Sequence, residues 1–513
     1  MRSWFRDTYL TIDARGLGAG RIALALVLLV DLARRLPFAT LWYSNEGLLP
    51  NHTVLWRPTS EYVFSLFFTA SLPHEAMIAF ALCAAVYLLL LVGLKTRLAQ
   101  VGSLLAVLSL HGRVLFIQNS GDVVLVALCV WTSFLPLGRR YSIDAVRRES
   151  AAAFPEPTPV VSWAVLAIVV QLAVIYLFNA VQKSGPGWRH GTAVHYVLYY
   201  ANLVTALAVW VRGWITPRMS QLLTWSTRLT EAVLPLLLLT PVFRRPARWL
   251  AIALVVGLHV GFGLFLNLGI FVPAMLVFAP FLVPASDWDR LERLWSTSIV
   301  GATTKRVLAR AFAVLERRGL LGARTPAREP VSSGISLRSR ARVREGAVLA
   351  LMACAAGGAI FDNSDITHVP AALEPRAVAA VVGYLQIYQV WTMFAPDVPT
   401  TEKTVAVDAV TADGRHVDPL NEVLSPGHPF QGGAIPPRLG NNGLASAYLA
   451  RLPYSPDYFT ALGEWLLRYP ERTHRAADRI VSFRVLTVEQ PDPPPGQRQP
   501  GNARWNLLFG YPN

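Results

Sequence analysis

The stretch IYLFNAVQKSGPGWRHG, residues 175–191, decides the fold, because an apolar run ends there in a lysine, a glycine and proline turn and a tryptophan. The run begins near residue 159, and its length matches the about 20 residues that a helix needs to cross a bilayer. Lys183 is the first candidate for chemistry. The alternative is a snorkelling anchor, whose ammonium lies among lipid headgroups while its stem covers apolar surface.

Composition indicates a polytopic membrane protein. Hydrophobic residues make up 53% of the 513 residues, mean hydropathy is +0.39 and charged residues make up 15%, against about 25% in soluble proteins. The net charge of +15 comes from short loops and one linker, as positive-inside topology requires. No basic helix or aromatic-interleaved patch accompanies it, which argues against nucleic-acid binding.

The three cysteines, Cys83, Cys129 and Cys354, lie in apolar runs. They have neither Cys-x-x-Cys spacing nor a histidine at ligand distance, so they are expected to be small core residues. We therefore expect no disulfide framework and no metal site.

Nine apolar stretches are predicted to cross the membrane. They are 16–36, 75–94, 98–116, 121–137, 159–182, one of the pair 192–211 and 219–241, then 249–266, 268–285 and 346–361. The segment 41–72 contains an aromatic run, Tyr62 to Phe68, that is too short to cross and is expected to be interfacial or lid-like. The fold class is thus an all-α polytopic membrane domain with re-entrant or interfacial segments and a small C-terminal extramembrane α+β domain.

The basic loops predict the topology. With the N-terminus inside, Lys183 and everything after Phe361 lie outside. Parity then allows only one of the stretches 192–211 and 219–241 to cross, and the other is expected to be re-entrant or interfacial. Arg34 and Arg35, at the outer end of the first span, oppose this topology. The segments placed inside are 95–97, 139–148, 244–248 and the arginine-rich linker.

Four segments follow from these spans. They are a transmembrane domain (1–285), a basic cytoplasmic linker (286–345), a last transmembrane helix (346–361) and an extracytoplasmic domain (362–513). In the last of these, Pro375 to Phe394 predicts an amphipathic helix. The stretches 404–410 and 480–488 alternate as strands do, and Asp413-Gly414 predicts a turn.

Ionisable and amide side chains inside or beside the spans are candidates for a site, because such groups are expensive in lipid. They are Arg21, Asp31, Asp122, Lys183, Glu231 and His259, with Asn119, Asn179 and Asn267 nearby. The alternative for Arg21 and Asp31 is a structural ion pair between helices. The alternative for His259 is a hydrogen bond that bridges packed helices.

Four motifs carry a resemblance to a known family. They are Phe178 to Trp188 followed by Gly191, Leu258 to Phe271 with His259 and a later Leu-Gly-x-Phe, Asn119-Ser-Gly-Asp122, and Gln389 to Pro396. In this order they resemble the vitamin K-dependent gamma-carboxylases and their bacterial relatives, the HTTM (horizontally transferred transmembrane) proteins. The resemblance covers most of residues 5–285 and, more loosely, 375–420.

The resemblance implies a membrane enzyme that couples epoxidation of a quinol by O2 to carboxylation of protein glutamate with CO2. Its cofactor is reduced vitamin K or menaquinol. Lys183 is implied as the catalytic base and His259 as the group that hydrogen-bonds the quinone or stabilises an oxyanion. A lysine acts as a base only when neutral, and an apolar cavity favours that form. We expect Asn119, Asp122, Asn179 and Trp188 to bind the cofactor. Arg21, Asp31 and Glu231 are expected to have structural or orienting roles.

The chain departs from the animal enzymes at Ser120, where they have a histidine, so Asp122 is the candidate for part of that role. The large propeptide-binding region of those enzymes is not recognisable. The alternatives are a non-enzymatic scaffold or lipid- or quinone-binding protein, and a transporter. In each case we expect an integral protein of a bacterial cytoplasmic membrane. For the enzyme, the expected partners are the bilayer, a quinol and a glutamate-containing protein or peptide.

Overall fold

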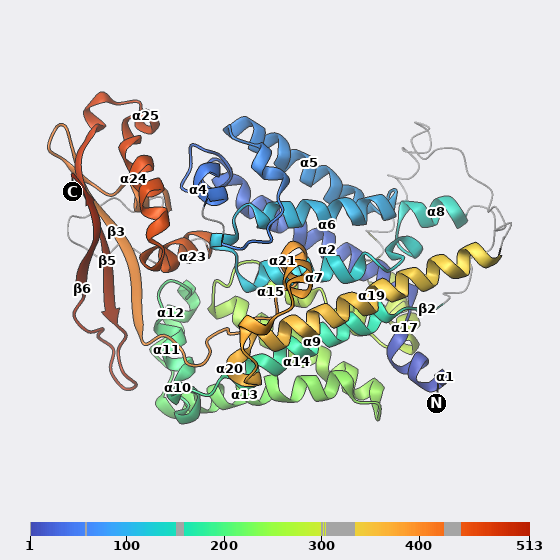
Figure 1. Cartoon of the computed structure of the whole chain (residues 1–513). Coiled ribbons are helices and arrows are strands. Elements are labelled where there is room, and N and C mark those ends of the chain that lie inside the picture. The colour runs from blue at the N-terminus through green and yellow to red at the C-terminus, as the bar shows by residue number, and fades with distance from the viewer. Residues whose placement is uncertain are drawn as a thin grey trace.

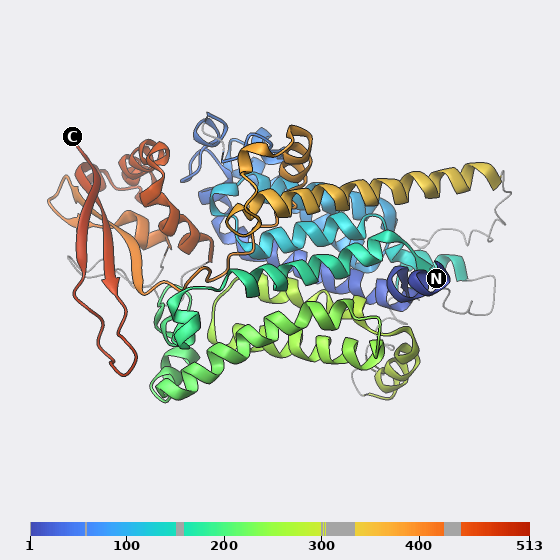
Figure 2. The same cartoon turned by 60° about the horizontal axis from the view of Figure 1, so that its bottom comes forward.

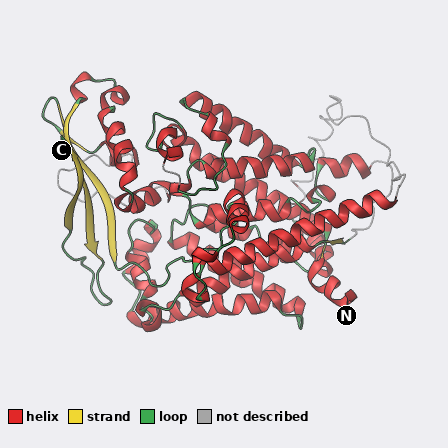
Figure 3. Cartoon of the chain, in the orientation of Figure 1, coloured by secondary structure: helices red, strands yellow, loops and turns green. Residues whose placement is uncertain are grey.

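The computed structural model describes residues 2–56, 59–149, 159–298, 301, 303, 334–424 and 443–512. Long helices lie side by side in a bundle, and a smaller unit with a sheet lies at one end of it (Figure 1). The view turned by 60° shows the same two parts (Figure 2). The long strands all lie in the smaller unit (Figure 3). A mostly helical membrane domain with a small C-terminal α+β unit is thereby confirmed.

Six described helices are long and apolar enough to cross a membrane, or up to seven if one bent pair counts as a span. The six are α2, continued by α3 (Ala14–Arg35, Ala39–Tyr43), α5 (Pro73–Val92), α9 (Trp163–Gln182), α13 (Pro217–Leu239), α14 (Arg244–Phe265) and α19 (Gly334–Asp362). The bent pair is Phe271–Leu282 with Ala285–Thr297, at 86°. The predicted number of nine crossings is not confirmed.

Two predicted crossings form shorter helices, α6 (Thr96–Gly112) and α7 (Ser120–Thr132). The predicted span 121–137 was too long at its end. The hydroxyl of Thr132 donates to the carbonyl of Leu128 and that of Ser133 to the carbonyl of Cys129, and Pro136 lacks the N–H that a continuing helix needs. At about 1.5 Å per residue, neither helix spans about 30 Å of hydrocarbon alone.

The two competing stretches after Trp188 fold differently. The first is broken into α11 (Ala193–Tyr199) and α12 (Ala206–Arg212), whereas the second forms the continuous helix α13. Thr216 caps α13 by accepting a hydrogen bond from the N–H of Met219, and α13 packs on α9 and α14. The prediction that only one stretch spans therefore agrees with the helix lengths, and α13 is that one.

The bundle has an apolar outer surface. Large hydrophobic side chains remain exposed on α5, α6, α13 and α14, among them Leu82, Leu98, Leu229 and Leu264. A water-soluble protein rarely exposes so much contiguous apolar surface, so this surface is suited to lipid.

Shorter elements join these helices. They are α1 (Arg2–Phe5), α4 (Asn51–Trp56), η3 (Leu66–Thr69), α8 (Ile143–Glu149), α10 (Pro186–His190), α15 (Phe271–Leu276), α16 (Ala279–Leu282), α17 (Trp288–Thr297), α20 (Ser364–Thr367) and the paired strands β1 (Thr11–Ile12) and β2 (Val160–Val161). The aromatic run 62–68 forms loop and the start of η3 and does not cross the bundle.

The smaller unit contains a four-stranded antiparallel sheet in the order β4-β3-β5-β6. The strands are β3 (Thr401–Thr411), β4 (His416–Val417), β5 (Ile480–Pro491) and β6 (Arg504–Tyr511), and the helices are α22 (Pro419–Leu424), α23 (Gly443–Arg451), α24 (Phe459–Leu467) and α25 (Tyr469–Thr473). The two predicted strands are confirmed within β3 and β5. The sequence missed β6 because its side chains do not alternate in burial.

One predicted helix was too long. The amphipathic helix 375–394 stops early, as α21 (Arg376–Leu385), because Gln386 has a left-handed backbone with φ 50°. The helix that contains the predicted last span 346–361 begins earlier in the chain, at Gly334, so Arg340, Arg342 and Arg344 of the predicted linker lie on α19. Most of the linker 286–345 lies outside the described residues.

Candidate functional site

Lys183 lies where the backbone leaves α9. The helix ends at Gln182, and Lys183 has φ −72° and ψ 66°. Pro186 starts α10 at a position that tolerates proline, and Gly191 ends it with φ 78°. The chain therefore turns back over the end of α9, which brings the ring of Trp188 to 4.6 Å from Lys183 Nζ.

Glu231 of α13 is the ionic partner of Lys183. The Lys183 Nζ lies 2.5 Å from Oε1 of Glu231 and also contacts Oε2. The two residues are only 3% and 4% exposed. A snorkelling anchor would carry its ammonium into headgroups or water, so this alternative disagrees with the structure. Next to the pair, Pro235 has no N–H to donate to the carbonyl of Glu231.

One face of α9 leads to the pair. Tyr176, Asn179 and Lys183 follow one another at i, i+3 and i+7, which is one side of a helix. The amide of Asn179 donates to the carbonyl of Ile175 at 2.9 Å, while its Oδ1 is buried with no hydrogen-bond partner. An unsatisfied buried acceptor costs about 1–3 kcal/mol, so Asn179 Oδ1 offers a bonding position to a ligand donor.

His259 of α14 lies beside the same face. Its Nδ1 is 2.9 Å from the carbonyl of Val255, to which it donates, and 3.4 Å from the hydroxyl of Tyr176. This bond assigns the proton to Nδ1 and leaves Nε2 as an acceptor. The Tyr176 hydroxyl thus links α9 to His259 of α14. The rings of Phe262 and Phe271 lie 5.7 and 5.5 Å from the imidazole.

The segment that leads into the α+β unit covers the Lys183 turn. Backbone N–H groups of the turn donate to the Pro396 carbonyl, at 2.8 Å from Gly185, and to the Asp397 carboxylate, at 3.0 and 3.1 Å from Gly187. The indole of Trp188 donates to the carbonyl of Phe394 at 2.7 Å. A Cβ on either glycine would come within 2.5 Å of Asp397. Glycine is therefore required by this close approach.

A second buried cluster gathers charged groups of α2, α6 and α7. Arg35 donates to Asp31 at 2.9 Å, to Asp122 at 2.6 Å and to the Tyr43 hydroxyl at 3.0 Å. His111 Nε2 lies 3.0 Å from Asp31. The predicted alternative for Asp31, a structural ion pair between helices, agrees with these contacts.

Asn119 and Asp122 have local partners. Asn119 caps α7 by accepting from the N–H groups of Gly121 and Asp122, and Asp122 accepts in return from the N–H of Asn119. Phe271 packs closely on Gly121 as well as on His259. Phe271 therefore lies between the start of α7 and His259. A cofactor-binding role for Asn119 and Asp122 stays a prediction.

Arg21 belongs to the opposite end of the bundle. Its guanidinium donates to the carbonyls of Leu90, Leu91 and Tyr141. It thus holds α2 against the last turn of α5 and the loop before α8, in keeping with the structural role expected for it.

Sequence reasoning missed four residues of these two clusters: Arg35, His111, Tyr176 and Asp397. Asp397 directly follows the motif Gln389 to Pro396, which was a usable signal. Tyr176 could have been found from its spacing to Lys183. The pairing of Arg35 with Asp122, 87 residues away, has no signal in a single sequence.

Asp31, His111 and Asp122 are the kinds of residue that hold a metal, and their ligand atoms lie within 4.8 Å of one another. The guanidinium of Arg35 already bonds to both carboxylates. Its positive charge compensates the two acids where a cation would otherwise do so.

Comparison with known families agrees with the resemblance drawn from the motifs. No curated protein and no solved structure matches the chain. The family model described as HTTM domain matches residues 9–288, more than half of the 513 residues. The matched region contains Lys183, Glu231, His259 and the whole of the second cluster, and the chain therefore belongs to the HTTM domain family.

Proposed function

We propose that this protein is a carboxylase-type membrane enzyme, which couples the epoxidation of a quinol by O2 to the carboxylation of a protein glutamate with CO2. The observation that carries the proposal is the buried pair of Lys183 and Glu231 at the covered end of α9. Membership of the HTTM domain family supports the role that the resemblance gives to this lysine.

Lys183 and Glu231 together control one proton. Burial disfavours separated charges, and the pair has a second form, amine and carboxylic acid, that differs only in where the proton lies along the short Nζ–Oε bond. In that form the Lys183 amine has a free electron pair and is able to accept a proton from an acidic hydroxyl. Glu231 is then the group that keeps the lysine available as a base.

The residues around the pair fit a quinol. Asn179 Oδ1 has no donor, and His259 presents Nε2 as an acceptor. Aromatic rings of Tyr176, Phe271 and Trp188 supply flat apolar surfaces for a quinone ring. Bound reduced vitamin K or menaquinol would supply, with O2, the strong base that removes a proton from the glutamate γ-carbon.

Exclusion of water is the second contribution of the chain. Asn179 and His259 are each 1% exposed and Trp188 is buried. The segment 394–397 closes the site on the side of the α+β unit. A site that excludes water strengthens the local electrostatic interactions and protects a carbanion from protonation.

The test supplies the purified full-length protein with menaquinol or vitamin K hydroquinone, O2, labelled bicarbonate and a glutamyl peptide. We expect label in the peptide together with quinone epoxide. Lys183→Ala should abolish both products, because the base is lost. Lys95→Asn is the control, since Lys95 is an exposed lysine at the other end of the bundle with a left-handed backbone that asparagine tolerates.

Absence of both products with either quinol would refute the proposal. Binding of menaquinol without turnover, unchanged in Lys183→Ala, would instead favour the quinone-binding scaffold. Quinone epoxide without labelled peptide would limit the function to quinol oxidation. The two products are measured separately because Ser120 stands where the animal carboxylases have a histidine.

A further inference from the structure

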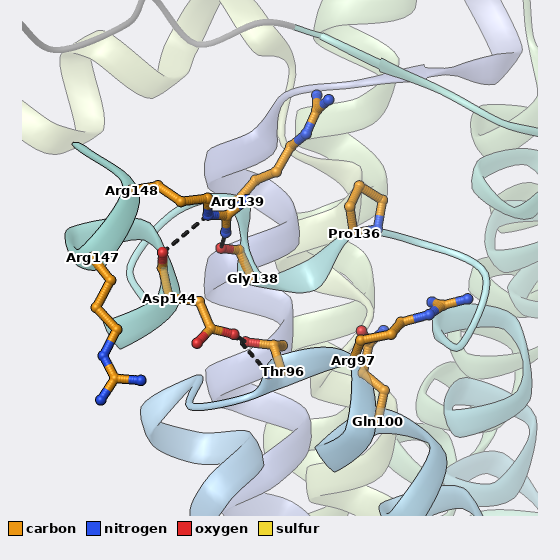
Figure 4. Close-up of a pocket in the computed structure, with 9 residues that line it drawn as sticks. All are labelled: Thr96, Arg97, Gln100, Pro136, Gly138, Arg139, Asp144, Arg147 and Arg148. Atoms are coloured by element: carbon orange, nitrogen blue, oxygen red, sulfur yellow. Dashed lines mark hydrogen bonds between the residues drawn. The ribbon is translucent and has the colours of Figure 1, made fainter. Parts of the chain in front are cut away.

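An arginine-lined cleft lies at the other end of the bundle from Lys183. It has a volume of about 420 Å³ and is lined by residues of α6, α8 and the loop between α7 and α8 (Figure 4). Four of its nine lining residues are arginines: Arg97, Arg139, Arg147 and Arg148. The two views of the bundle show α8 at the end opposite to α10 (Figure 1, Figure 2).

The one carboxylate among the cleft's lining residues accepts hydrogen bonds from the start of α6. Asp144 accepts from the N–H of Lys95 at 3.0 Å, and from the N–H and hydroxyl of Thr96 at 2.7 Å. Figure 4 shows its carboxylate turned towards Thr96. The lining thus combines four arginines with this one aspartate.

The cleft is framed by rigid local contacts. Arg148 donates to the carbonyls of Asp144 and Gly138, at 2.9 and 2.5 Å, and Gln100 donates to those of Thr132 and Leu135 at 2.8 and 2.9 Å. The N–H of Asp144 donates to the Gly93 carbonyl at 3.0 Å. These bonds fix α8 and the loop before it against the start of α6, so the cleft is built into the fold.

An apolar path leads away from the cleft along α6. Leu98, Val101 and Leu105 follow one another at i, i+3 and i+7 on one side of the helix, and Leu98 is 70% exposed. A ligand with a phosphate head and acyl chains matches a basic cleft continued by such a path, whereas free phosphate would use only the cleft.

We propose that this cleft binds the phosphate headgroup of an anionic phospholipid, whose acyl chains lie along Leu98, Val101 and Leu105. Basic pockets between helices at the cytoplasmic side of a membrane recognise acidic headgroups in this way. Arginine suits the task because its planar guanidinium bonds a phosphate through two N–H groups. The site is separate from Lys183 and does not depend on the proposed chemistry.

The experiment measures lipid binding to the delipidated full-length protein by native mass spectrometry. The lipids are phosphatidylglycerol and phosphatidylcholine. We expect phosphatidylglycerol to bind in preference, and Arg139→Gln/Arg147→Gln to weaken it about 30-fold, from about 1 kcal/mol for each basic side chain near an anionic headgroup. The matched control is Arg290→Gln/Arg293→Gln on α17, which removes the same charge from exposed arginines outside the cleft and should leave binding unchanged.

A second measurement uses the unaltered protein. Phosphatidylglycerol should slow hydrogen exchange at residues 93–101 and 138–148, and inorganic phosphate at millimolar concentration should not. The proposal would be overturned if both double variants lost phosphatidylglycerol binding equally. It would also be overturned if phosphatidylglycerol did not slow hydrogen exchange in these two segments. Protection by inorganic phosphate equal to that by lipid would overturn the phospholipid assignment in favour of a free anion.

Discussion

Removing the carboxylate of Glu231 alone should destabilise the protein far more than removing the whole buried pair. Glu231→Leu keeps the volume, so no cavity adds to the effect, but it leaves Lys183 buried without its partner. Breaking a buried ion pair on one side costs about 3–5 kcal/mol. Lys183→Met/Glu231→Leu removes both charges, and we expect its stability to lie within about 1 kcal/mol of the unaltered protein.

The penalty of Glu231→Leu should also depend on pH. The stranded lysine escapes its charge by releasing a proton, which costs about 4.6 kcal/mol at pH 7 for an ordinary lysine pKa of about 10.4. The same release costs about 1.9 kcal/mol at pH 9. The free energy lost through Glu231→Leu should therefore shrink as pH rises, whereas a loss of packing alone would be the same at both values.

The assay is unfolding in detergent micelles, followed by tryptophan fluorescence at pH 7 and pH 9. The half-exposed pair of Lys403 and Glu489, with its N–O distance of 2.9 Å, supplies the control. Glu489→Leu should cost less than about 1 kcal/mol, because solvent screens such pairs. The reasoning is refuted if Glu231→Leu costs no more than this control, or if its penalty does not change between the two pH values.

Three further predictions concern the covering segment and the α+β unit. Gly187→Ala should destabilise the Lys183 turn by about 1–3 kcal/mol, because a Cβ there meets Asp397 Oδ1 at 2.5 Å; Gly257→Ala, with nothing within 4 Å, is the control for thermal unfolding. Asp397→Ala should speed hydrogen exchange at Gly187 and quenching of Trp188, and unchanged rates would contradict its covering role. Burial raises the pKa of Asp418 from 3.8 to about 6. The folded state thus holds this proton more tightly than the unfolded state, and stability should fall as pH rises from about 4 to 6. Asp418→Asn should remove that slope in thermal melts, and a slope that persists would assign it to another group.

The sequence located most long helices because membrane insertion itself requires a continuous apolar run. The predicted starts and ends of α5 and α9 lie within a few residues of those observed. Polar interruptions were harder to judge. Pro136, which lacks the N–H of a continuing helix, follows the end of α7, and the left-handed Gln386 ends α21, although hydrophobic side chains continue beyond both helices.

The site was predictable only as separate parts. Lys183, Glu231 and His259 stood out because each is ionisable within apolar sequence. Their arrangement depends on how α9, α13 and α14 pack, and no single sequence gives that packing. Lys183 and Glu231 are 48 residues apart and meet because α13 crosses the bundle beside α9.

The second cluster also bears on the topology. Arg34 and Arg35 opposed an outward position for this end of α2, since basic residues near a span normally remain inside. Arg35 is buried, however, and bonds both Asp31 and Asp122, while Arg34 lies 3.8 Å from Asp31. Two acids thus balance two arginines within the protein, and the bilayer meets little net charge there. Arginines are present at both ends of the bundle, with Arg97 and Arg148 at the cleft and exposed Arg189 and Arg218 at the Lys183 end. Because their charges are compensated within the protein, Arg34 and Arg35 no longer count against the predicted orientation, which itself stays a prediction.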